Sequence, residues 1–380
     1  MKRVGIIGCG EISNIYLNNI SRYFHGLTVA ACADIDPNRA RLAADRHGIA
    51  KACSAEELLA DADIDVILNL TVPKVHYEIN RQALLAGKHV YCEKPMALSM
   101  DQVEELQRLS REGRLALGCA PDTFLGPALQ TCRKLIDDGW IGRPVAAVAN
   151  MVSHGHETWH PNPDFFYQKG GGPMMDMGPY YISALVSMLG PVLSTSCFCG
   201  QGQESRRIYT RERYGQEIPV EVPTHYAGIL KFRQGTIASL NMSFDVWLSH
   251  LPKLEIYGTE GTLVVPDPNR FDGEVKLLRA DSLIKEVDGK KAGEAAGMLS
   301  RPEMWEHFKS MPRMFGRPAE NMRGLGLADL AGALEAGREH RTNPEFTGHV
   351  TEVLLSFEKA QREGVQHMRT TCARPEPIKL

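Results

Sequence analysis

Residues 4–13 read VGIIGCGEIS, an apolar run that leads directly into a glycine turn. Apolar residues then recur at helical spacing from Ile12 onward, which predicts a helix immediately after the turn. A strand, a glycine turn and a helix N-terminus in this order are typical of a site for dinucleotide phosphates. Gly8 would permit the tight turn, and Gly10 would let the backbone approach the pyrophosphate. Because Ser13 replaces the third glycine of the motif, a plain strand-to-helix connector is the alternative.

A second apolar run supports the nucleotide site. Residues 27–33 are apolar and end at Asp34, twenty-four residues beyond Gly10. An acidic residue at about this spacing typically accepts hydrogen bonds from the adenosine ribose hydroxyls. Its charge would repel a 2′-phosphate, so the sequence favours NAD over NADP, and Arg39 is the nearby cation that could reverse this preference. The alternative is that Asp34 caps a loop, as aspartates often do.

The composition is that of an ordinary globular protein. The chain has 380 residues, enough for two domains, and 43% of them are hydrophobic and 23% charged. A net charge of −3 without a basic run argues against nucleic-acid binding. Since no apolar stretch could span a bilayer and no signal peptide is evident, we expect no membrane association and a cytoplasmic location. Nine cysteines without framework spacing predict reduced thiols.

Strand and helix patterns alternate through the first third of the chain. Further strand-like runs lie at 64–70, 89–92 and 115–117, and helical patterns lie at 39–47, 56–59, 75–86 and 100–110. Repeated βα units imply a doubly wound parallel sheet. We therefore expect a Rossmann domain over residues 1–122.

The pattern changes after residue 122. A helical pattern at 130–138 is followed by longer strand-like runs at 145–152, 225–232, 236–244 and 254–257. The turn Gly258-Thr259-Glu260-Gly261 between apolar runs is a hairpin signal. These features predict an α+β domain over residues 123–380 with a large, mainly antiparallel open sheet. Apolar spacing at 304–315 suggests a short amphipathic helix that covers the core or contacts another subunit.

Two stretches carry residues suited to catalysis. The first, Glu93-Lys94-Pro95, follows a predicted strand at the sheet edge where ligands of open α/β folds bind. A lysine there could reach the nicotinamide pocket and a substrate hydroxyl. A Glu-Lys pair is also common on protein surfaces, so this motif alone is weak.

The second stretch, residues 170–181, reads GGGPMMDMGPYY. Its glycines would let the chain approach a ligand, and Pro179 fits only in the first turn of the helix that follows. Asp176 and Tyr180 are four residues apart, so we expect them to share one helix face near its start. A capping aspartate and a core tyrosine are the alternative reading.

Together these motifs resemble the glucose–fructose oxidoreductase / inositol dehydrogenase / MocA (Gfo/Idh/MocA) family of nicotinamide-dependent sugar oxidoreductases. The resemblance runs from Val4 to about Gly348, and the combination is more specific than any single motif. The matching features are Gly8-x-Gly10, Asp34, Thr71-Val72-Pro73 with His76, Ala86 to Val90, Glu93-Lys94-Pro95, the glycine run with Asp176, and Gly258 to Gly261.

The resemblance implies a set of site residues. It implies hydride transfer between NAD(P) and a hydroxyl carbon, with Lys94 and Asp176 at the reacting centre. Many members carry a histidine four residues after this aspartate; Tyr180 stands there in this chain, and we expect it to be the acid–base residue. The expected cofactor contacts are Gly8, Gly10, Glu11, Ile12, Asp34, Arg39, Thr71, Pro73, His76, Glu93 and Lys94.

Residues 154–160 read HGHETWH and invite a metal interpretation. The family resemblance places this segment near the substrate pocket, so contact with sugar hydroxyls is favoured and no metal is expected. Solvent-exposed or structural histidines are another reading, and Trp159 could stack on a pyranose face. The expected substrate contacts are Lys94, His156, Trp159, His160, Asp176 and Tyr180.

The sequence therefore predicts an NAD-dependent dehydrogenase that acts on a secondary hydroxyl of a sugar, glycoside or cyclic polyol. Lys94 would place a positive charge beside that hydroxyl, Asp176 would fix the geometry, and Tyr180 would take the proton. A homo-oligomer, dimer or tetramer, is expected through the C-terminal sheet. The alternatives are a non-catalytic, NAD-sensing regulator of the same fold and an enzyme whose transient oxidation leads to elimination or glycoside cleavage.

Overall fold

Six parallel strands, wound with helices, form the N-terminal part of the protein, and their order is β3-β2-β1-β4-β5-β6. This doubly wound sheet is the one predicted from the sequence. The strands are β1 (Lys2–Ile7), β2 (Leu27–Ala33), β3 (Lys51–Cys53), β4 (Val66–Asn69), β5 (His89–Cys92) and β6 (Leu117–Cys119). The helices are α1 (Ser13–Tyr23), α2 (Pro37–His47), α3 (Ala55–Ala60), α4 (Pro73–Leu85) and α5 (Met100–Gly113). The computed structural model describes residues 1–288, 290, 297–298, 301–315 and 321–378.

Local sequence signals set the ends of these elements. Ser54 and Glu57 form a capping box at the start of α3, which satisfies two N–H groups reciprocally. Gly87 follows α4 with a φ of 74°, the left-handed conformation that favours glycine after a helix. The last strand begins at Leu117 instead of Leu115, because the N–H of Leu115 still closes the end of α5.

A nine-stranded sheet, β16-β15-β14-β13-β7-β12-β11-β8-β17, forms the second half. Among its described strand pairs only β7 and β12 run parallel, so the mainly antiparallel sheet is confirmed. The strands are β7 (Pro144–Val152), β8 (Val192–Gly200), β11 (His225–Phe232), β12 (Ile237–Ser243), β13 (Leu254–Gly258), β14 (Gly261–Val265), β15 (Lys276–Arg279), β16 (Lys309–Ser310) and β17 (Gln366–His367). A separate hairpin joins β9 (Ser205–Arg207) to β10 (Glu217–Pro219).

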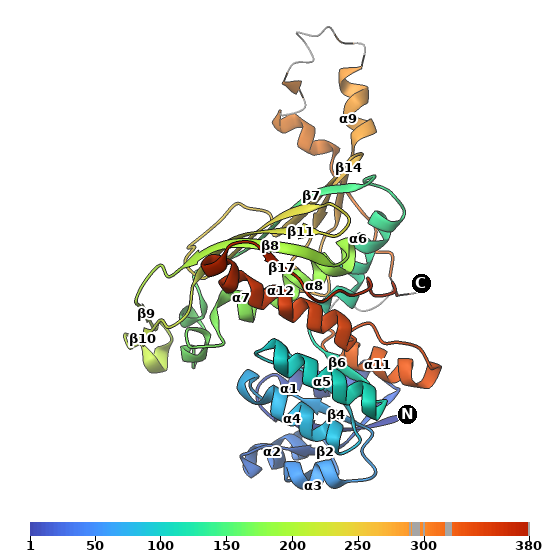
Figure 1. Cartoon of the computed structure of the whole chain (residues 1–380), viewed down its shortest axis with the longest axis vertical. Coiled ribbons are helices and arrows are strands. Elements are labelled where there is room, and N and C mark those ends of the chain that lie inside the picture. The colour runs from blue at the N-terminus through green and yellow to red at the C-terminus, as the bar shows by residue number, and fades with distance from the viewer. Residues whose placement is uncertain (289, 291–296, 299–300, 316–320, 379–380) are drawn as a thin grey trace.

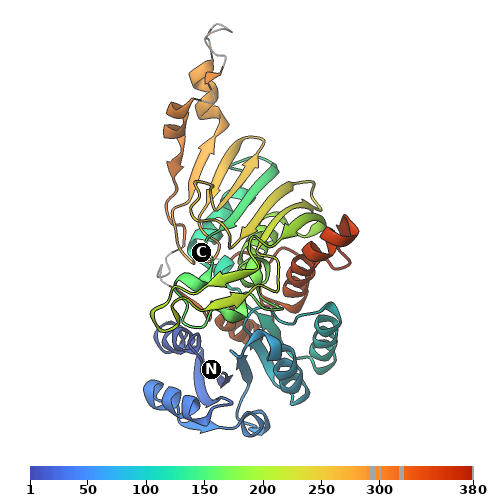
Figure 2. The same cartoon turned by 90° about the vertical axis from the view of Figure 1, so that its left-hand side faces the viewer.

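Helices cover one face of this sheet and leave the other face open (Figures 1 and 2). They are α6 (Pro127–Asp137), α7 (Gly172–Asp176), α8 (Gly178–Leu189) and α12 (Pro344–Glu363). Residues of β11 are alternately exposed and buried, as expected when one face of a strand packs on helices. Helix α12 contacts α5 and β6 as well as β8, so it lies between the two sheets; α11 (Leu325–Ala336) also packs on β6.

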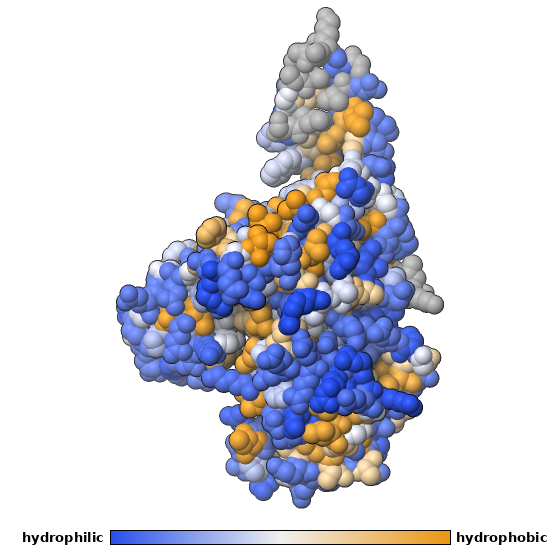
Figure 3. Space-filling model, in the orientation of Figure 1, coloured by the Kyte–Doolittle hydropathy of each residue, from blue (hydrophilic) through white to orange (hydrophobic). Residues whose placement is uncertain are grey.

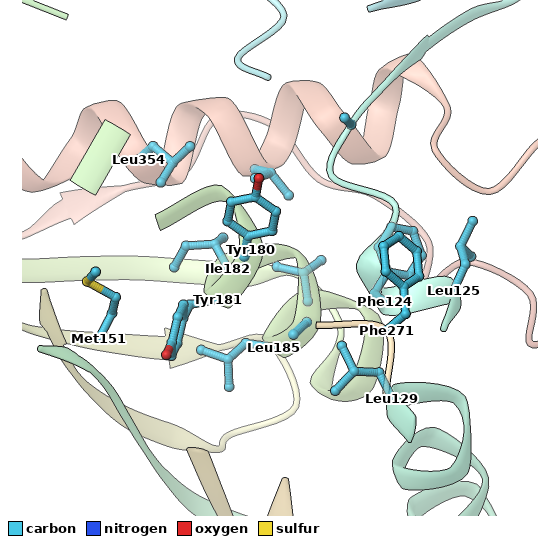
Figure 4. Packing of buried hydrophobic residues seen from close by; sticks show 14 of the residues in the cluster. Phe124, Leu125, Leu129, Met151, Tyr180, Tyr181, Ile182, Leu185, Phe271 and Leu354 are labelled. Carbon is cyan, nitrogen blue, oxygen red and sulfur yellow. The ribbon is translucent and has the colours of Figure 1, made fainter. Parts of the chain in front are cut away.

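The apolar core around α8 positions the candidate site. Ile182 and Leu185 are fully buried, and Phe124 and Leu129 pack in the same cluster (Figure 4). The first turn of α8, which carries Tyr180, is therefore held from several sides.

Residues 304–315 do not form the short amphipathic helix predicted from the sequence. A short 3₁₀ helix, η6 (Pro302–His307), precedes β16, which pairs with β15 at the sheet edge. Met311 and Met314 pack on the core from irregular chain, whereas Trp305 is exposed. Residues 304–315 are all described, whereas residues 289, 291–296, 299–300 and 316–320 lie outside the described residues.

The segment that carries α9 (Ala280–Val287) and η6 projects from the sheet (Figure 1). Apolar side chains gather on it, whereas the surface over α5 and α12 is mainly hydrophilic (Figure 3). The helices that the structure describes include none that is both long and apolar enough to cross a membrane. All nine cysteines are described, and each is a free thiol.

Candidate active site

The glycine turn lies where the strand order reverses, between β1 and β4. Gly8 has a φ of 102°, and a Cβ atom there would lie 2.6 Å from the carbonyl carbon of Leu70, just beyond β4. A Cβ at Gly10 would meet no atom within 4 Å. The turn thus packs tightly against the neighbouring strand end and stays open on its outer side, at the start of α1, where a phosphate could approach the helix N-terminus.

Asp34 stands beside this turn at the end of β2. Its Oδ2 accepts the N–H of Cys9 at 2.7 Å, and its Oδ1 accepts the N–H of Asp36 at 2.9 Å. Each oxygen keeps a further lone pair for a ribose hydroxyl. Arg39 is exposed and lies 3.7 Å from the carboxylate of Asp36, so it forms no contact with Asp34.

The other expected cofactor residues flank the same sheet edge. Glu11 and Ile12 belong to the turn before α1, Pro73 begins α4, and Thr71 is anchored by two hydrogen bonds to Asn69 Oδ1. The Gly10 opening, the free lone pairs of Asp34 and the helix N-terminus together fit a bound dinucleotide.

His76 links two loops at this edge. Its Nδ1 lies 2.7 Å from the carbonyl oxygen of Pro95, and its Nε2 lies 2.9 Å from that of Thr71. Two carbonyl acceptors require two N–H donors, so the ring carries both protons. Burial alone would lower the pKa of His76, but the neighbouring Cys92 and the two carbonyls raise it to about 9.

Glu93 is buried at the end of β5 and holds the start of the next loop. Its Oε1 accepts the hydroxyl of Tyr16 in α1 at 2.7 Å, and its Oε2 accepts the N–H of Lys94 at 3.0 Å. Glu93 therefore connects the cofactor-binding helix to the backbone that presents the lysine.

Lys94 and Asp176 meet across the two halves of the protein. Lys94 Nζ lies 2.9 Å from Asp176 Oδ1 and 2.6 Å from the Asp176 carbonyl oxygen. Both side chains are largely buried. Burial opposes both charges, but each group outweighs it for the other: the pKa of Lys94 is raised and that of Asp176 is lowered. The pair is therefore ionised at neutral pH.

His156 completes a line of three polar side chains. Its Nε2 lies 3.1 Å from Asp176 Oδ2, the oxygen that Lys94 does not contact. Its ring stacks on Phe166 with centroids 3.8 Å apart, and its Nδ1 is buried without a hydrogen-bond partner among the described residues. The sequence grouped His156 with substrate contacts but gave no sign of its link to Asp176.

Tyr180 reaches the same place by a different route from the one predicted. Asp176 ends α7 and Tyr180 lies in the first turn of α8, so they do not share one helix; Met177 separates the two helices. Pro179, which lacks an N–H, stands in that first turn. Lys94 Nζ nevertheless lies 5.2 Å from the centre of the Tyr180 ring.

Arg323 is a site residue that the sequence analysis missed. Its Nη2 donates to the hydroxyl oxygen of Tyr180 at 3.4 Å and to Asn269 Oδ1 at 3.0 Å. Its guanidinium carbon lies 5.9 Å from the centre of the Tyr180 ring. No motif surrounds Arg323, and only the packing of residues 321–324 against α1, through Asn19, brings it here.

Arg206, a second residue that the sequence analysis missed, anchors the 154–160 segment through hydrogen bonds. This fully buried arginine donates to Glu157 Oε1 at 2.7 Å, to Asp245 Oδ1 at 2.7 Å and to the carbonyl oxygen of His154 at 2.7 Å. Trp159 is 63% exposed, and His160 lies edge-on to it. Within the described part of the chain no group of three or more His, Cys, Asp or Glu side chains could hold a metal ion.

The chain matches two domain models of one family. The model described as "Oxidoreductase family, NAD-binding Rossmann fold" matches residues 2–119, and "GFO/IDH/MocA C-terminal domain" matches residues 129–264. The 1,5-anhydro-D-fructose reductase of Ensifer adhaerens is 28% identical over 275 residues, which cover 70% of this chain and 75% of that protein. The myo-inositol 2-dehydrogenase of Thermotoga maritima is 22% identical over 262 residues, 69% of this chain and 74% of that protein.

Solved structures share the fold over nearly the whole chain. Levoglucosan dehydrogenase in complex with NADH has a TM-score of 0.77 and 19% identity, covering 97% of this chain and 99% of that one. An NAD binding oxidoreductase from Klebsiella pneumoniae has a TM-score of 0.74 and 22% identity, covering 96% and 98%. The predicted family is confirmed: the chain belongs to the Gfo/Idh/MocA family of NAD-binding oxidoreductases.

Proposed function

We propose that this oxidoreductase transfers a hydride between NAD and a secondary hydroxyl of a sugar, glycoside or cyclic polyol. The observation that carries the proposal is the Lys94–Asp176 pair, 2.9 Å apart, which joins the loop after β5 of the Rossmann sheet to the end of α7 in the second half. Relatives named for inositol, xylose and anhydrofructose substrates support the substrate class.

Each polar side chain has a proposed role. Lys94 donates a hydrogen bond to the reacting hydroxyl, and Asp176, held between Lys94 and His156, keeps that ammonium in place. Tyr180, in its phenolate form, accepts the hydroxyl proton and leaves the step as the neutral phenol; its oxygen already accepts a hydrogen bond from Arg323. NAD, when bound, takes up the hydride from the carbon.

The sugar itself is proposed to lie against the 154–160 segment. His156, Trp159 and His160 form an aromatic cluster near Asp176, and exposed indole rings suit the apolar face of a pyranose. The proposed reaction requires no metal.

We also propose a homo-oligomer through the open sheet face. Phe198 is 78% exposed, and Ile229 and Ile237 are each 51% exposed, on strands β8, β11 and β12. Large apolar side chains on one face typically mark a contact surface. Sedimentation equilibrium of the wild type and Phe198→Glu tests this, since the variant should shift towards monomer.

A substrate screen tests the catalytic proposal. NADH formation is followed with sugars, glycosides and inositols, and at least one should reduce NAD at a rate that Lys94→Ala abolishes while NAD still binds. The exposed Lys169→Ala is the control and should retain full activity. A Lys94→Ala enzyme with a near-normal rate would remove Lys94 from the mechanism.

A further inference from the structure

A pocket of about 520 Å³ is lined by Arg323, which contacts the hydroxyl of Tyr180. It is formed by the loop after β14 and by the chain that leads into α11. Its lining residues are Asn269, Arg270, Phe271, Asp272, Gly273, Asn321 and Arg323. Two arginines, two asparagines and one aspartate thus line a hollow that borders the proposed acid–base residue through Arg323.

Within the described residues neither arginine contacts a carboxylate directly, and the carboxylates of Glu93 and Asp122 act on Arg323 only from a longer distance. Arg323 donates only to uncharged oxygens: Asn321 Oδ1 at 2.9 Å, Asn269 Oδ1 at 3.0 Å and the hydroxyl of Tyr180 at 3.4 Å. The exposed Arg270 forms no ion pair in the part of the chain that the structure describes. The carboxylate that lines the pocket, Asp272, is engaged by Arg313 at 2.6 Å.

Three other arginines that are withdrawn from solvent have a direct carboxylate partner. Arg133, Arg206 and Arg341 each contact a carboxylate directly. Withdrawing a guanidinium from water is costly unless an anion pairs with it. Arg323 is only partly exposed and contacts the proposed acid–base residue, yet it lacks the direct carboxylate contact that these three arginines have.

We infer that Arg323 and Arg270 receive an oxyanion carried by the substrate, so that the substrate is an acidic sugar bearing a carboxylate or a phosphate. This inference rests on the proposed function and narrows its substrate class. A guanidinium fork matches the oxygens of either group. Since Arg323 contacts Tyr180, the anion lies close to the hydroxyl that is oxidised. The pyrophosphate of the cofactor has a separate place, at the Gly8–Gly10 turn.

Matched substrates test the inference. Hexuronates and hexose 6-phosphates are compared with their parent hexoses, and the readout is the ratio of kcat/KM for the acid to kcat/KM for the parent. At least one acid should exceed its parent tenfold in the wild type. Arg323→Met and Arg270→Ala should each lower this ratio at least tenfold. Arg143→Ala, an exposed arginine ahead of β7, is the control and should leave the ratio unchanged.

Binding of NAD, measured by fluorescence titration, separates the two sources of an oxyanion. If both variants weaken NAD binding tenfold and leave the ratio unchanged, the anion is a cofactor phosphate and the substrate assignment is overturned. Parent hexoses that are oxidised as well as the acids overturn it too, while the proposed dehydrogenase function stands. No NAD reduction with any compound overturns both. If Arg323→Met fails to fold, the exposed Arg270 still decides the outcome.

Discussion

At the scale of single residues, the site is built around the buried carboxylate of Asp176 and the two side chains that contact it. Asp176 accepts from Lys94 on one oxygen and faces His156 on the other, which outweighs the cost of burying its carboxylate. Removal of Lys94 would leave the buried carboxylate of Asp176 without its cationic partner. We therefore expect substitutions that remove a single polar group from this site to lower activity even where they leave the packing intact.

Tyr180→Phe isolates the proposed proton transfer, because it removes only the hydroxyl that contacts Arg323. We expect kcat to fall by about 10²- to 10⁴-fold, the usual contribution of general base catalysis. Tyr181→Phe is the matched control: Tyr181 projects from α8 toward the sheet, opposite to Tyr180, and its hydroxyl bonds to the Asn150 carbonyl oxygen (Figure 4). A loss below tenfold in Tyr180→Phe would assign the base to Lys94 or to a histidine of residues 154–160.

Asp34 is expected to make the enzyme prefer NAD. A carboxylate pairs well with two ribose hydroxyls and repels a 2′-phosphate. Wild-type kcat/KM should be higher with NAD than with NADP, and Asp34→Asn, which removes the charge but keeps the shape, should reduce that ratio at least tenfold. Preference for NADP in the wild type, lost in Arg39→Ala, would contradict this prediction.

At the scale of elements, the course of the backbone places the side chains of the site. The break between α7 and α8 delivers Asp176 and Tyr180 to one lysine from two helices. The turn after β1 carries two glycines with different surroundings: Gly8 packs against the backbone of Leu70, whereas Gly10 faces open space.

Alanine substitutions test these two glycines separately. Gly8→Ala adds a Cβ 2.6 Å from Leu70 in a left-handed conformation, so we expect a loss of about 1–3 kcal/mol in the free energy of unfolding. Gly10→Ala enters open space; its stability should stay within about 0.5 kcal/mol while the Kd for NAD rises at least tenfold. Chemical denaturation and NAD titration measure both. Unchanged NAD affinity in Gly10→Ala would place the pyrophosphate elsewhere.

At the scale of the whole molecule, α12 ties the two sheets together. It packs on β6 and α5 of the first sheet and on β8 of the second. His349 of this helix is fully buried, and its Nε2 accepts the N–H of Val192 at 2.9 Å. That nitrogen must therefore be unprotonated, and burial lowers the pKa of His349 to about 4.

This histidine should make stability depend on pH. Since its pKa is about 6.5 in the unfolded chain and about 4 in the folded one, the unfolded state binds the extra proton between these values. Stability is therefore lost as pH falls from about 6.5 to 4, by about 3 kcal/mol for this group. His349→Gln keeps a hydrogen-bond acceptor but does not titrate. The free energy of unfolding of the wild type minus that of the variant should therefore decrease by this amount as pH falls from about 6.5 to 4. A difference that is constant with pH would contradict the assignment.

The sequence by itself determined the architecture of both sheets, and it provided the residues that we propose for the cofactor site. Glycine turns, strand runs and helical spacing act over a few residues, so they can be read before the chain is folded. Gly8, Asp34 and Lys94 were accessible because each ends a recognisable strand. The amphipathic helix expected at 304–315 was wrong, because this segment forms a short 3₁₀ helix and then a strand that pairs with the sheet edge.

The family resemblance placed Lys94 and Asp176 at one reacting centre, but only the tertiary structure decided which of their atoms meet and which other charges join them. Lys94 and Asp176 are 82 residues apart in the chain, and Tyr180 and Arg323 are 143 apart. Such contacts depend on how two sheets and α12 pack, and no local pattern encodes that packing. Arg206 and Arg323 belong to no recognisable motif, so the sequence does not distinguish them from arginines on the surface. Their roles follow from the residues that surround them in space.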